Sequence, residues 1–414
     1  MLRFAFSPTH DLSLDELRLA LLNFIVAKQR SEDFIVRVED TSKRNVIEGK
    51  DKESLDLLDL FGIRYTQTIY QSQNFRFHSA MALQLMHEGK AFSCFCSPEW
   101  IQGKINDTEA AKKPYLYDDA CANLPAELVI DNTNPFTVRI YRPQNDIAIK
   151  DHLQGDVTFK ADTIDSFMIL KQDKTPMADF ASGIDDMLND ISLVIKSQED
   201  VESTPKQVYL RDQLEYNKQV EYIHLAPIGD DETPSVRSLL EQGYLPETIV
   251  NYLLSMDLEV ALEKFDIKTL LVNPKSFSLN DLKELNKECF KNMDAKELSR
   301  YVGFADAEIG ELARLYVDQV QTTKELKTKI APIFEPRVVP EELQEQYNAI
   351  KNCAKQAPYF DQYDDFKAYI ASETGLDKEN ISQTLRILLS NAKSGPDLAK
   401  IYQYIKNYLG EFTK

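Results

Sequence analysis

The 414-residue sequence predicts an α/β fold that is followed by an all-α region. Its first 70 residues alternate apolar, strand-like runs with segments of helical periodicity, an order that builds a parallel sheet. Beyond about residue 229 the periodicity is mainly helical. The length allows two to four domains with an ample core.

The opening elements follow from local patterns. "LRFAF" at residues 2–6 is a short apolar strand, and "FIVRVED" at 34–40 is mostly apolar, as buried parallel strands are. "KDKESLDLLDLFGI" at 50–63 predicts a helix closed by Gly62. Between the two strands, apolar residues at spacings of three and four mark an amphipathic helix: Leu14, Leu17, Leu21 and Ile25.

The pattern changes from about Tyr70 to Ile164, which predicts an insertion. This stretch holds a "CFC" cluster, a loop rich in Lys and Pro, and the strand-like "FTVRIYRP". Apolar strands then resume with "SFMILK" and "SLVIK", and the helical "ADFASGIDDMLND" lies between them.

Composition limits the function classes. A net charge of −19 makes nucleic-acid binding a poor expectation, because phosphate contacts need clustered Lys and Arg, although a local basic patch would still allow it, and we expect no DNA partner. Five cysteines, an odd number in a long chain, argue against a disulfide framework and for the cytoplasm. The sequence has no run of 18 apolar residues, so we expect no membrane span, and its N-terminus does not look like a signal peptide.

Eight sequence blocks, taken in order, span nearly the whole chain and are similar to blocks of bacterial glutamyl-tRNA synthetases, which are class I aminoacyl-tRNA synthetases. Each block alone is weak, and the ordered set is specific. The blocks are "RFAFSPT" (3–9), "RVEDTSKRN" (37–45), "YQSQNF" (70–75), "CFCSPE" (94–99), "DSFMILKQDKTP" (165–176), "STPKQ" (203–207), "EQGYLPETIVNYL" (241–253) and "TLRILLSNAKSGPDL" (384–398).

The resemblance implies four parts. A Rossmann-type class I catalytic domain would occupy residues 1–70 and 165–228, split by an acceptor-end subdomain with a candidate zinc site at 71–164. A helical stem-contact domain at 229–325 and a helical anticodon-binding-like domain at 326–414 would follow. The family joins glutamate and ATP, with Mg²⁺, into glutamyl adenylate and passes glutamate to the 3′ end of tRNA.

The first ATP signature of the family, roughly His-Ile-Gly-Gly at a helix start, aligns here with Ser13, Leu14, Asp15 and Glu16. A helix N-terminus is a natural phosphate site because its N–H groups are free and its dipole is positive there. Ser13 and Glu16 instead have the Ser-x-x-Glu spacing of a capping box, which uses these N–H groups internally. We therefore expect a helix start rebuilt for stability.

The second ATP signature, a Lys-Met-Ser-Lys-Arg loop before "EQGYLPE", is also absent. The aligned segment "PIGDDETPSVRSLL" has no lysine and is several positions short. Asp230, Asp231 and Glu232 stand where the family has cations that neutralise charge developing on the phosphates.

The resemblance also assigns an amino-acid pocket. Ala178 and Asp179 replace a Tyr and an Asn, and Lys196 replaces an Arg, which keeps the charge but loses bidentate geometry. Asp179 would repel a glutamate side chain. Arg3 and Glu39 are either remnants of the pocket or a scaffold ion pair. The full set is Arg3, Ala5, Ser7, Glu39, Ala178, Asp179 and Lys196.

A cysteine cluster matches a zinc site found in part of the family. Cys94, Cys96 and Cys121 with Tyr117 would supply three thiolates and a phenol, a closed set that suits a structural zinc. The alternative is three free thiols or a lapsed site. We expect Cys289 and Cys353 to lie in helix cores.

Three functions remain open on the sequence alone. In the first, the chain is a paralogue that has lost glutamate activation and binds tRNA of the glutamate type or a protein partner. Alternatively, it is a working glutamate–tRNA ligase with an altered site that uses ATP and Mg²⁺, or a regulatory protein without RNA binding. The two changed ATP signatures favour the first and third over the second.

Overall fold

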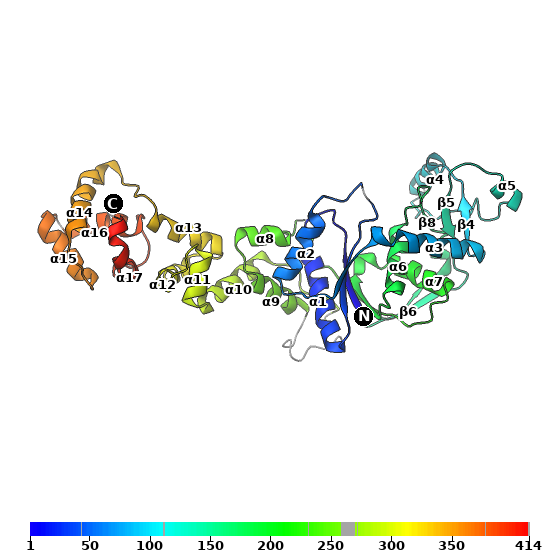
Figure 1. Ribbon diagram of the computed structural model, residues 1–414, viewed down its shortest axis with the longest axis horizontal. Helices are drawn as coiled ribbons and strands as arrows, with labels where there is room; N and C mark the ends of the chain where they lie inside the picture. Colours follow the sequence, from blue (N-terminus) through cyan, green and yellow to red (C-terminus); the bar gives the residue numbers. More distant parts are fainter. Residues whose placement is uncertain are drawn as a thin grey trace. The chain divides into compact units, whose positions relative to one another are not determined.

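A computed structural model describes the chain except for residues 43, 111, 231, 258–269, 271, 377 and 413–414, and describes only the backbone of 378–380. The chain forms two compact units (Figure 1). The first contains Met1–Val236 and Leu253–Phe277, and the second contains Arg237–Tyr252 and Ser278–Lys414. Across the described residues, no helix has both the length and the apolar character needed to span a bilayer.

The first unit is built on a seven-stranded sheet in the order β3-β2-β1-β9-β10-β6-β7. Its pairings are parallel except for the antiparallel β6–β7 pair, and Leu2 aligns with Phe34. The predicted strands at 2–6, 34–40 and 192–196 are confirmed. The strands are β1 (Leu2–Phe6), β2 (Phe34–Val38), β3 (Gln67–Tyr70), β6 (Ile147–Asp151), β7 (Gly155–Phe159), β9 (Leu193–Ser197) and β10 (Glu221–Leu225).

Helices predicted for this unit are also present. Helix α1 buries Leu17 and Leu21, and α2 is followed by Gly62 in the left-handed region at φ 73°, where glycine carries no steric cost. Helices α6 and α7 contact each other. The bounds are α1 (Leu14–Arg30), α2 (Lys50–Leu60), α6 (Ala178–Leu188) and α7 (Ser203–Gln213), with a short 3₁₀ turn at Gln198–Asp200 before α7.

A second, antiparallel sheet in this unit has the order β4-β5-β8. The predicted strand at 166–171 therefore pairs with β5, whereas β6 and β7, which lie within the predicted insertion, join the large sheet. An apolar run predicts a buried strand but does not identify its partner. The elements here are β4 (Ala91–Cys94), β5 (Thr137–Ile140), β8 (Met168–Leu170), α3 (Phe75–His87), α4 (Pro98–Ala110) and α5 (Ala126–Ile130), with 3₁₀ turns at Gln71–Asn74 and Ala161–Thr163.

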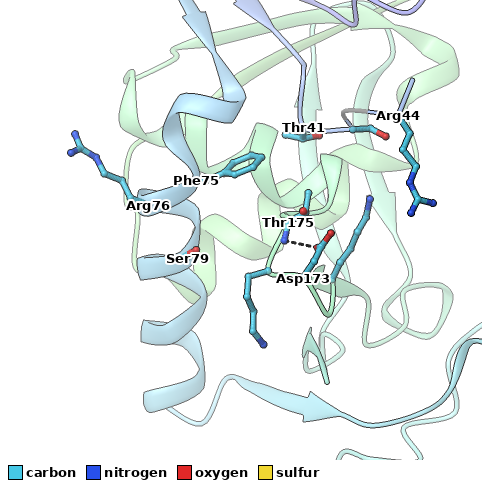
Figure 2. A pocket seen from close by; sticks show the side chains of 10 residues that line it. Thr41, Arg44, Phe75, Arg76, Ser79, Asp173 and Thr175 are labelled. Carbon is cyan, nitrogen blue, oxygen red and sulfur yellow. Dashed lines mark hydrogen bonds between the residues drawn. The ribbon is translucent and has the colours of Figure 1, made fainter. Parts of the chain in front are cut away.

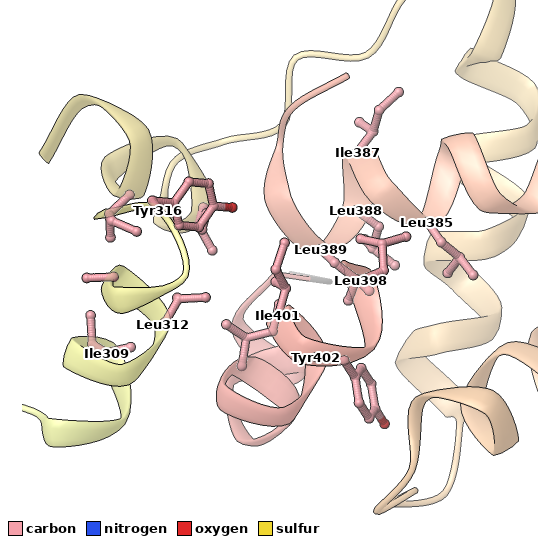
Figure 3. Packing of buried hydrophobic residues seen from close by; sticks show 14 of the residues in the cluster. Ile309, Leu312, Tyr316, Leu385, Ile387, Leu388, Leu389, Leu398, Ile401 and Tyr402 are labelled. Atoms are coloured by element: carbon pink, nitrogen blue, oxygen red, sulfur yellow. The ribbon is translucent and has the colours of Figure 1, made fainter. Parts of the chain in front are cut away.

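The helical second half of the sequence is confirmed. Ile309 and Leu312 of α12 pack toward Ile401 of α17 in a core that also contains Leu385 and Tyr402 (Figure 3). The helices are α8 (Val236–Gln242), α9 (Pro246–Asp257), α10 (Leu279–Asn292), α11 (Ala295–Tyr301), α12 (Ala307–Arg314), α13 (Thr323–Phe334), α14 (Gln344–Gln356), α15 (Tyr363–Thr374), α16 (Lys378–Ser390), α17 (Leu398–Ile405) and α18 (Leu409–Phe412), with 3₁₀ turns at Val317–Gln319, Glu341–Leu343 and Lys406–Tyr408.

Candidate functional site

The start of α1 is closed by its own side chains. Ser13 Oγ accepts from the Glu16 backbone N–H at 3.1 Å, and the Ser13 N–H donates to Glu16 Oε2 at 2.8 Å. The predicted capping box is therefore confirmed. Leu14 is buried in the core. Two groups that a phosphate would otherwise use at this helix start are already satisfied.

The carboxylate of Asp15 binds the segment that precedes the second signature loop. Its oxygens accept from the backbone N–H groups of Ile228 at 3.0 Å and Gly229 at 3.3 Å. Arg18 Nη1 donates to the same carboxylate at 3.3 Å. The negative charge at the start of α1 thus comes from the chain itself, and it holds the backbone at 228–229.

Arg18 also holds the segment at 226–229 close to the start of α1. Its Nε and Nη2 donate to the two carboxylate oxygens of Asp257 at 2.7 and 2.6 Å, and its Nη1 donates to the Ala226 carbonyl at 2.7 Å. Arg18 and Asp257 are both buried, at 2% and 0% exposure. Such a fully satisfied, bidentate pair is geometrically specific, and removing either partner would leave a buried charge.

The described residues of the loop aligned with the second ATP signature form a turn that is stabilised by its own hydrogen bonds. The Asp230 N–H donates to Thr233 Oγ1 at 2.9 Å, and the Glu232 N–H donates to Asp230 Oδ1 at 3.1 Å. The Val236 N–H then donates to the Leu12 carbonyl at 3.0 Å. Asp231 lies outside the described residues. No lysine is present from 227 to 240, and the described charged side chains of the turn itself, Asp230 and Glu232, are both carboxylates.

The predicted amino-acid pocket is a cavity of about 200 Å³ lined by the middle of β1, the ends of β2 and β9, and the first turns of α6 and α7. Six of the seven predicted positions line it: Arg3, Ala5, Glu39, Ala178, Asp179 and Lys196. Ser7 is not among its lining residues. The role of these residues in binding glutamate stays a prediction.

The arginines of this pocket are held by a buried aspartate that sequence reasoning missed. Arg3 donates to both oxygens of Asp186 at 3.2 and 3.4 Å, and Arg37 donates to Asp186 and, at 3.1 Å, to Glu39. Burial alone would raise the pKa of Asp186, but Arg3 and Arg37 outweigh it and hold the pKa well below its usual range. A charge inside the apolar strand "FIVRV" was the available signal for Arg37.

The opposite wall carries two further pairs. Asp179 accepts from Lys206 at 3.1 Å, and Lys196 Nζ donates to Ser203 Oγ at 2.7 Å. Burial, and then the neighbouring Arg3, lower the pKa of Lys196 to about 8, while nearby carboxylates led by Asp200 act in the opposite direction. Each charge that the resemblance assigns to glutamate binding therefore has a partner within the chain.

A larger cavity of about 710 Å³ is lined by hydroxyl groups and cations. Figure 2 shows Phe75 directed into it toward Thr175, while Arg76 extends outward from α3. Asp173 accepts from the Thr175 N–H at 2.9 Å. Four cationic side chains outnumber this one carboxylate: Arg44, Arg76, Lys171 and Lys174. Of these, Arg44, Lys171 and Lys174 fell within blocks that carried the resemblance but were not assigned a role, and Arg76 had no distinct signal.

The predicted zinc ligands also come together. The sulfur atoms of Cys94, Cys96 and Cys121 lie within 4.8 Å of one another. The Tyr117 hydroxyl is 3.4 Å from Cys94 Sγ and 3.5 Å from Cys96 Sγ, and it accepts from the Cys121 N–H. Three thiols and a buried phenol are a donor set that zinc accepts. Cys289, which is partly buried, packs against the core of the second unit.

Comparison with known proteins extends over the whole chain. The family model for "tRNA synthetases class I (E and Q), catalytic domain" matches residues 1–264. The chain is 51% identical to glutamate–tRNA ligase 2 of Sulfurimonas denitrificans, with all of both chains covered. It is 39% identical to glutamate–tRNA ligase 2 of Sulfurovum sp. over 99% of each chain, and 36% identical to glutamate–tRNA ligase 1 of Campylobacter jejuni over both full lengths.

A solved structure shows the same fold. The glutamate tRNA ligase from Elizabethkingia meningosepticum, in complex with its amino acid, superimposes with a TM-score of 0.78 at 20% identity, covering 99% of this chain and 97% of that one. The Rossmann-type class I synthetase fold predicted from the sequence is confirmed. On these matches, the chain belongs to the glutamate–tRNA ligase family of class I aminoacyl-tRNA synthetases.

Proposed function

We propose that this chain is a glutamate–tRNA ligase family member that does not form glutamyl adenylate and that acts by binding tRNA. The observation that carries the proposal is the Asp15 carboxylate at the start of α1, bonded to the backbone N–H groups of Ile228 and Gly229. In an active class I enzyme, this helix start receives ATP. A triphosphate would have to displace an anion that already has its partners.

Electrostatics opposes the displacement. Two unit charges 4 Å apart interact by about 1 kcal/mol in water and about 4 kcal/mol at the effective dielectric of a protein surface. Asp15, Asp230 and Glu232 would each oppose a phosphate bound nearby, and Arg18, which donates to Asp15, offsets part of this repulsion. The absent lysines would have stabilised the transition state, and one such contact is worth about 10²–10³ in rate.

The larger cavity supports the RNA part of the proposal. Arg44, Lys171 and Lys174 line it together with Phe75, and cations beside an aromatic ring suit a single-stranded nucleotide. The overall charge of −19 opposes non-specific attraction. We therefore propose binding that is micromolar as an order of magnitude at physiological salt, selective for glutamate-type tRNA.

An active ligase is the second candidate, and one observation favours it. The chain matches relatives named glutamate–tRNA ligase over their full length, at up to 51% identity among those compared. If it is active, ATP and Mg²⁺ would have to bind at the altered helix start. A protein partner in place of tRNA is a further outcome, which the binding test below addresses.

Glutamate-dependent ATP–pyrophosphate exchange, with tRNA present, tests the loss of activation. We expect no exchange above background, because both ATP elements now carry carboxylates. An active relative assayed in parallel serves as the positive control. Exchange at about 1 per second or faster, a rate typical of working enzymes, would establish the second candidate instead.

Filter binding tests the RNA proposal, with glutamate-type tRNA compared against an RNA of equal length and charge. We expect a preference for the tRNA, reduced about tenfold or more when Arg44 and Lys171 are both changed to Ala, since two phosphate contacts would be lost. Lys52→Ala, at an exposed lysine of α2, is the matched control. Equal, feeble binding to both RNAs would point to a protein partner.

We propose that zinc, bound by Cys94, Cys96, Cys121 and Tyr117, supports the insertion. All four positions would be filled by protein, so the zinc would be structural and would not take part in catalysis. Elemental analysis of protein purified without chelator should give about one zinc per chain. Cys94→Ser should abolish zinc binding, and the control Cys289→Ser should not. Zero zinc together with three freely titratable thiols would refute the site.

A further inference from the structure

The pocket of about 200 Å³ contains a serine–lysine pair that glutamate binding does not require. Lys196 Nζ lies 2.7 Å from Ser203 Oγ, and both side chains line the cavity. Lys196 extends from β9 and is 8% exposed, whereas Ser203 begins α7 and is partly exposed. Lys196 donates to Oγ, and the single hydroxyl proton is directed to the Asp200 carbonyl at 2.8 Å. The hydroxyl therefore has to rotate toward a neutral Lys196 before its proton is transferred.

The surroundings of Lys196 make its ammonium group easier to deprotonate than that of an ordinary lysine. Burial and Arg3 lower the pKa of Lys196 to about 8, against the opposing charges of Asp200, Asp186 and Asp179. About a tenth of the amine is then unprotonated at pH 7, far more than for an ordinary lysine, and the share rises to about half near pH 8. An unprotonated amine can accept the proton of a serine hydroxyl, and serine–lysine pairs serve as nucleophile and base in several hydrolases.

The same cavity supplies a donor for a developing oxyanion. Arg3 lines it, and its Nε and Nη2 are bound to Asp186, whereas its Nη1 makes no hydrogen bond to any described residue. Glu39 and Asp179 also line the cavity and are anions suited to an ammonium group. The volume corresponds to roughly six or seven waters at about 30 Å³ each, which is enough for a small aminoacyl group.

We propose that Ser203 and Lys196 hydrolyse aminoacyl esters bound in this pocket. Ser203 Oγ attacks the ester carbonyl as Lys196 takes its proton, and Arg3 stabilises the oxyanion. The bond from the carbonyl carbon to the alcohol oxygen breaks, and the alcohol leaves with the proton from Lys196. Water then attacks the acyl–serine, with its proton passing through Lys196 to Ser203 Oγ. The products are a free amino acid and an alcohol.

The ester could be free or attached to the 3′ end of a tRNA, and the second source rests on the proposed function. The two cavities are lined by neighbouring residues of the same segments, Glu39 and Asp179 at the small one and Thr41 and Thr175 at the large one. An aminoacyl group in the small cavity would then carry its RNA into the cationic one. The two sources share one chemistry and are separated by the test.

The first arm uses the p-nitrophenyl esters of alanine and glutamine, which need no RNA. We expect hydrolysis above buffer, rising with pH through about 8 as Lys196 becomes neutral. Ser203→Ala and Lys196→Arg should each lower the rate about 100-fold or more, the usual contribution of such a base. Lys196→Arg keeps the positive charge at this position but cannot act as a base. A lower hydrolysis rate in this variant would therefore reflect the missing base and not only a missing charge.

The matched controls Ser394→Ala and Lys52→Met, both at exposed positions, should keep the native rate. Intact mass spectrometry after a rapid acid quench should show an acyl adduct on the native chain and none on Ser203→Ala. A rate unchanged in Ser203→Ala, or an adduct elsewhere, would overturn the proposal.

The second arm uses alanyl-tRNA and glutamyl-tRNA. Release of the amino acid by the native chain, lost in Ser203→Ala, supports the serine–lysine pair acting on an RNA-borne ester. Hydrolysis of the small esters without release from either tRNA supports the pair and refutes tRNA as the source. Tight tRNA binding with no hydrolysis of any ester refutes the pair and leaves the proposed function standing.

Discussion

The carboxylate of Asp15 bonds to the backbone of residues 228–229, and the proposal that this chain does not activate glutamate rests on this contact. It brings a negative charge to a helix N-terminus, where the free N–H groups and the dipole would otherwise favour a phosphate. Two further features stabilise the elements around this contact. They are the capping box of Ser13 and Glu16 and the buried Arg18–Asp257 pair. A stable helix start and a nucleotide site compete for the same N–H groups, and here the internal groups occupy them.

In the predicted amino-acid pocket, charged side chains are likewise bound by other residues of the chain. Asp186 holds Arg3 and Arg37, Lys206 holds Asp179, and Ser203 accepts from Lys196. A fully paired pocket costs less to bury than one with a free charge, because an unpaired buried ion pays its full desolvation. The consequence is a cavity in which the charged residues predicted for glutamate binding already have partners within the chain.

Sequence reasoning predicted what local patterns and an ordered resemblance can carry. Strands at 2–6 and 34–40, the capping box, and the grouping of Tyr117 with the cysteines all followed from spacing or from the family blocks. The Asp15 contact could not be predicted, because its partners are more than 200 positions away and are backbone groups. Asp186 was missed because helical spacing marks a buried face without saying which charges meet there. The pairing of β8 with β5 was missed because an apolar run does not specify its neighbour.

Calorimetric titration of the native chain with ATP and Mg²⁺ tests the central claim most directly, since it reports on the helix start without requiring glutamate or tRNA. The internal anion predicts no measurable binding at millimolar ATP, whereas Asp15→Gly should gain affinity by removing the charge and freeing the N–H groups of Ile228 and Gly229. ATP binding by the native chain at micromolar concentration would contradict the account.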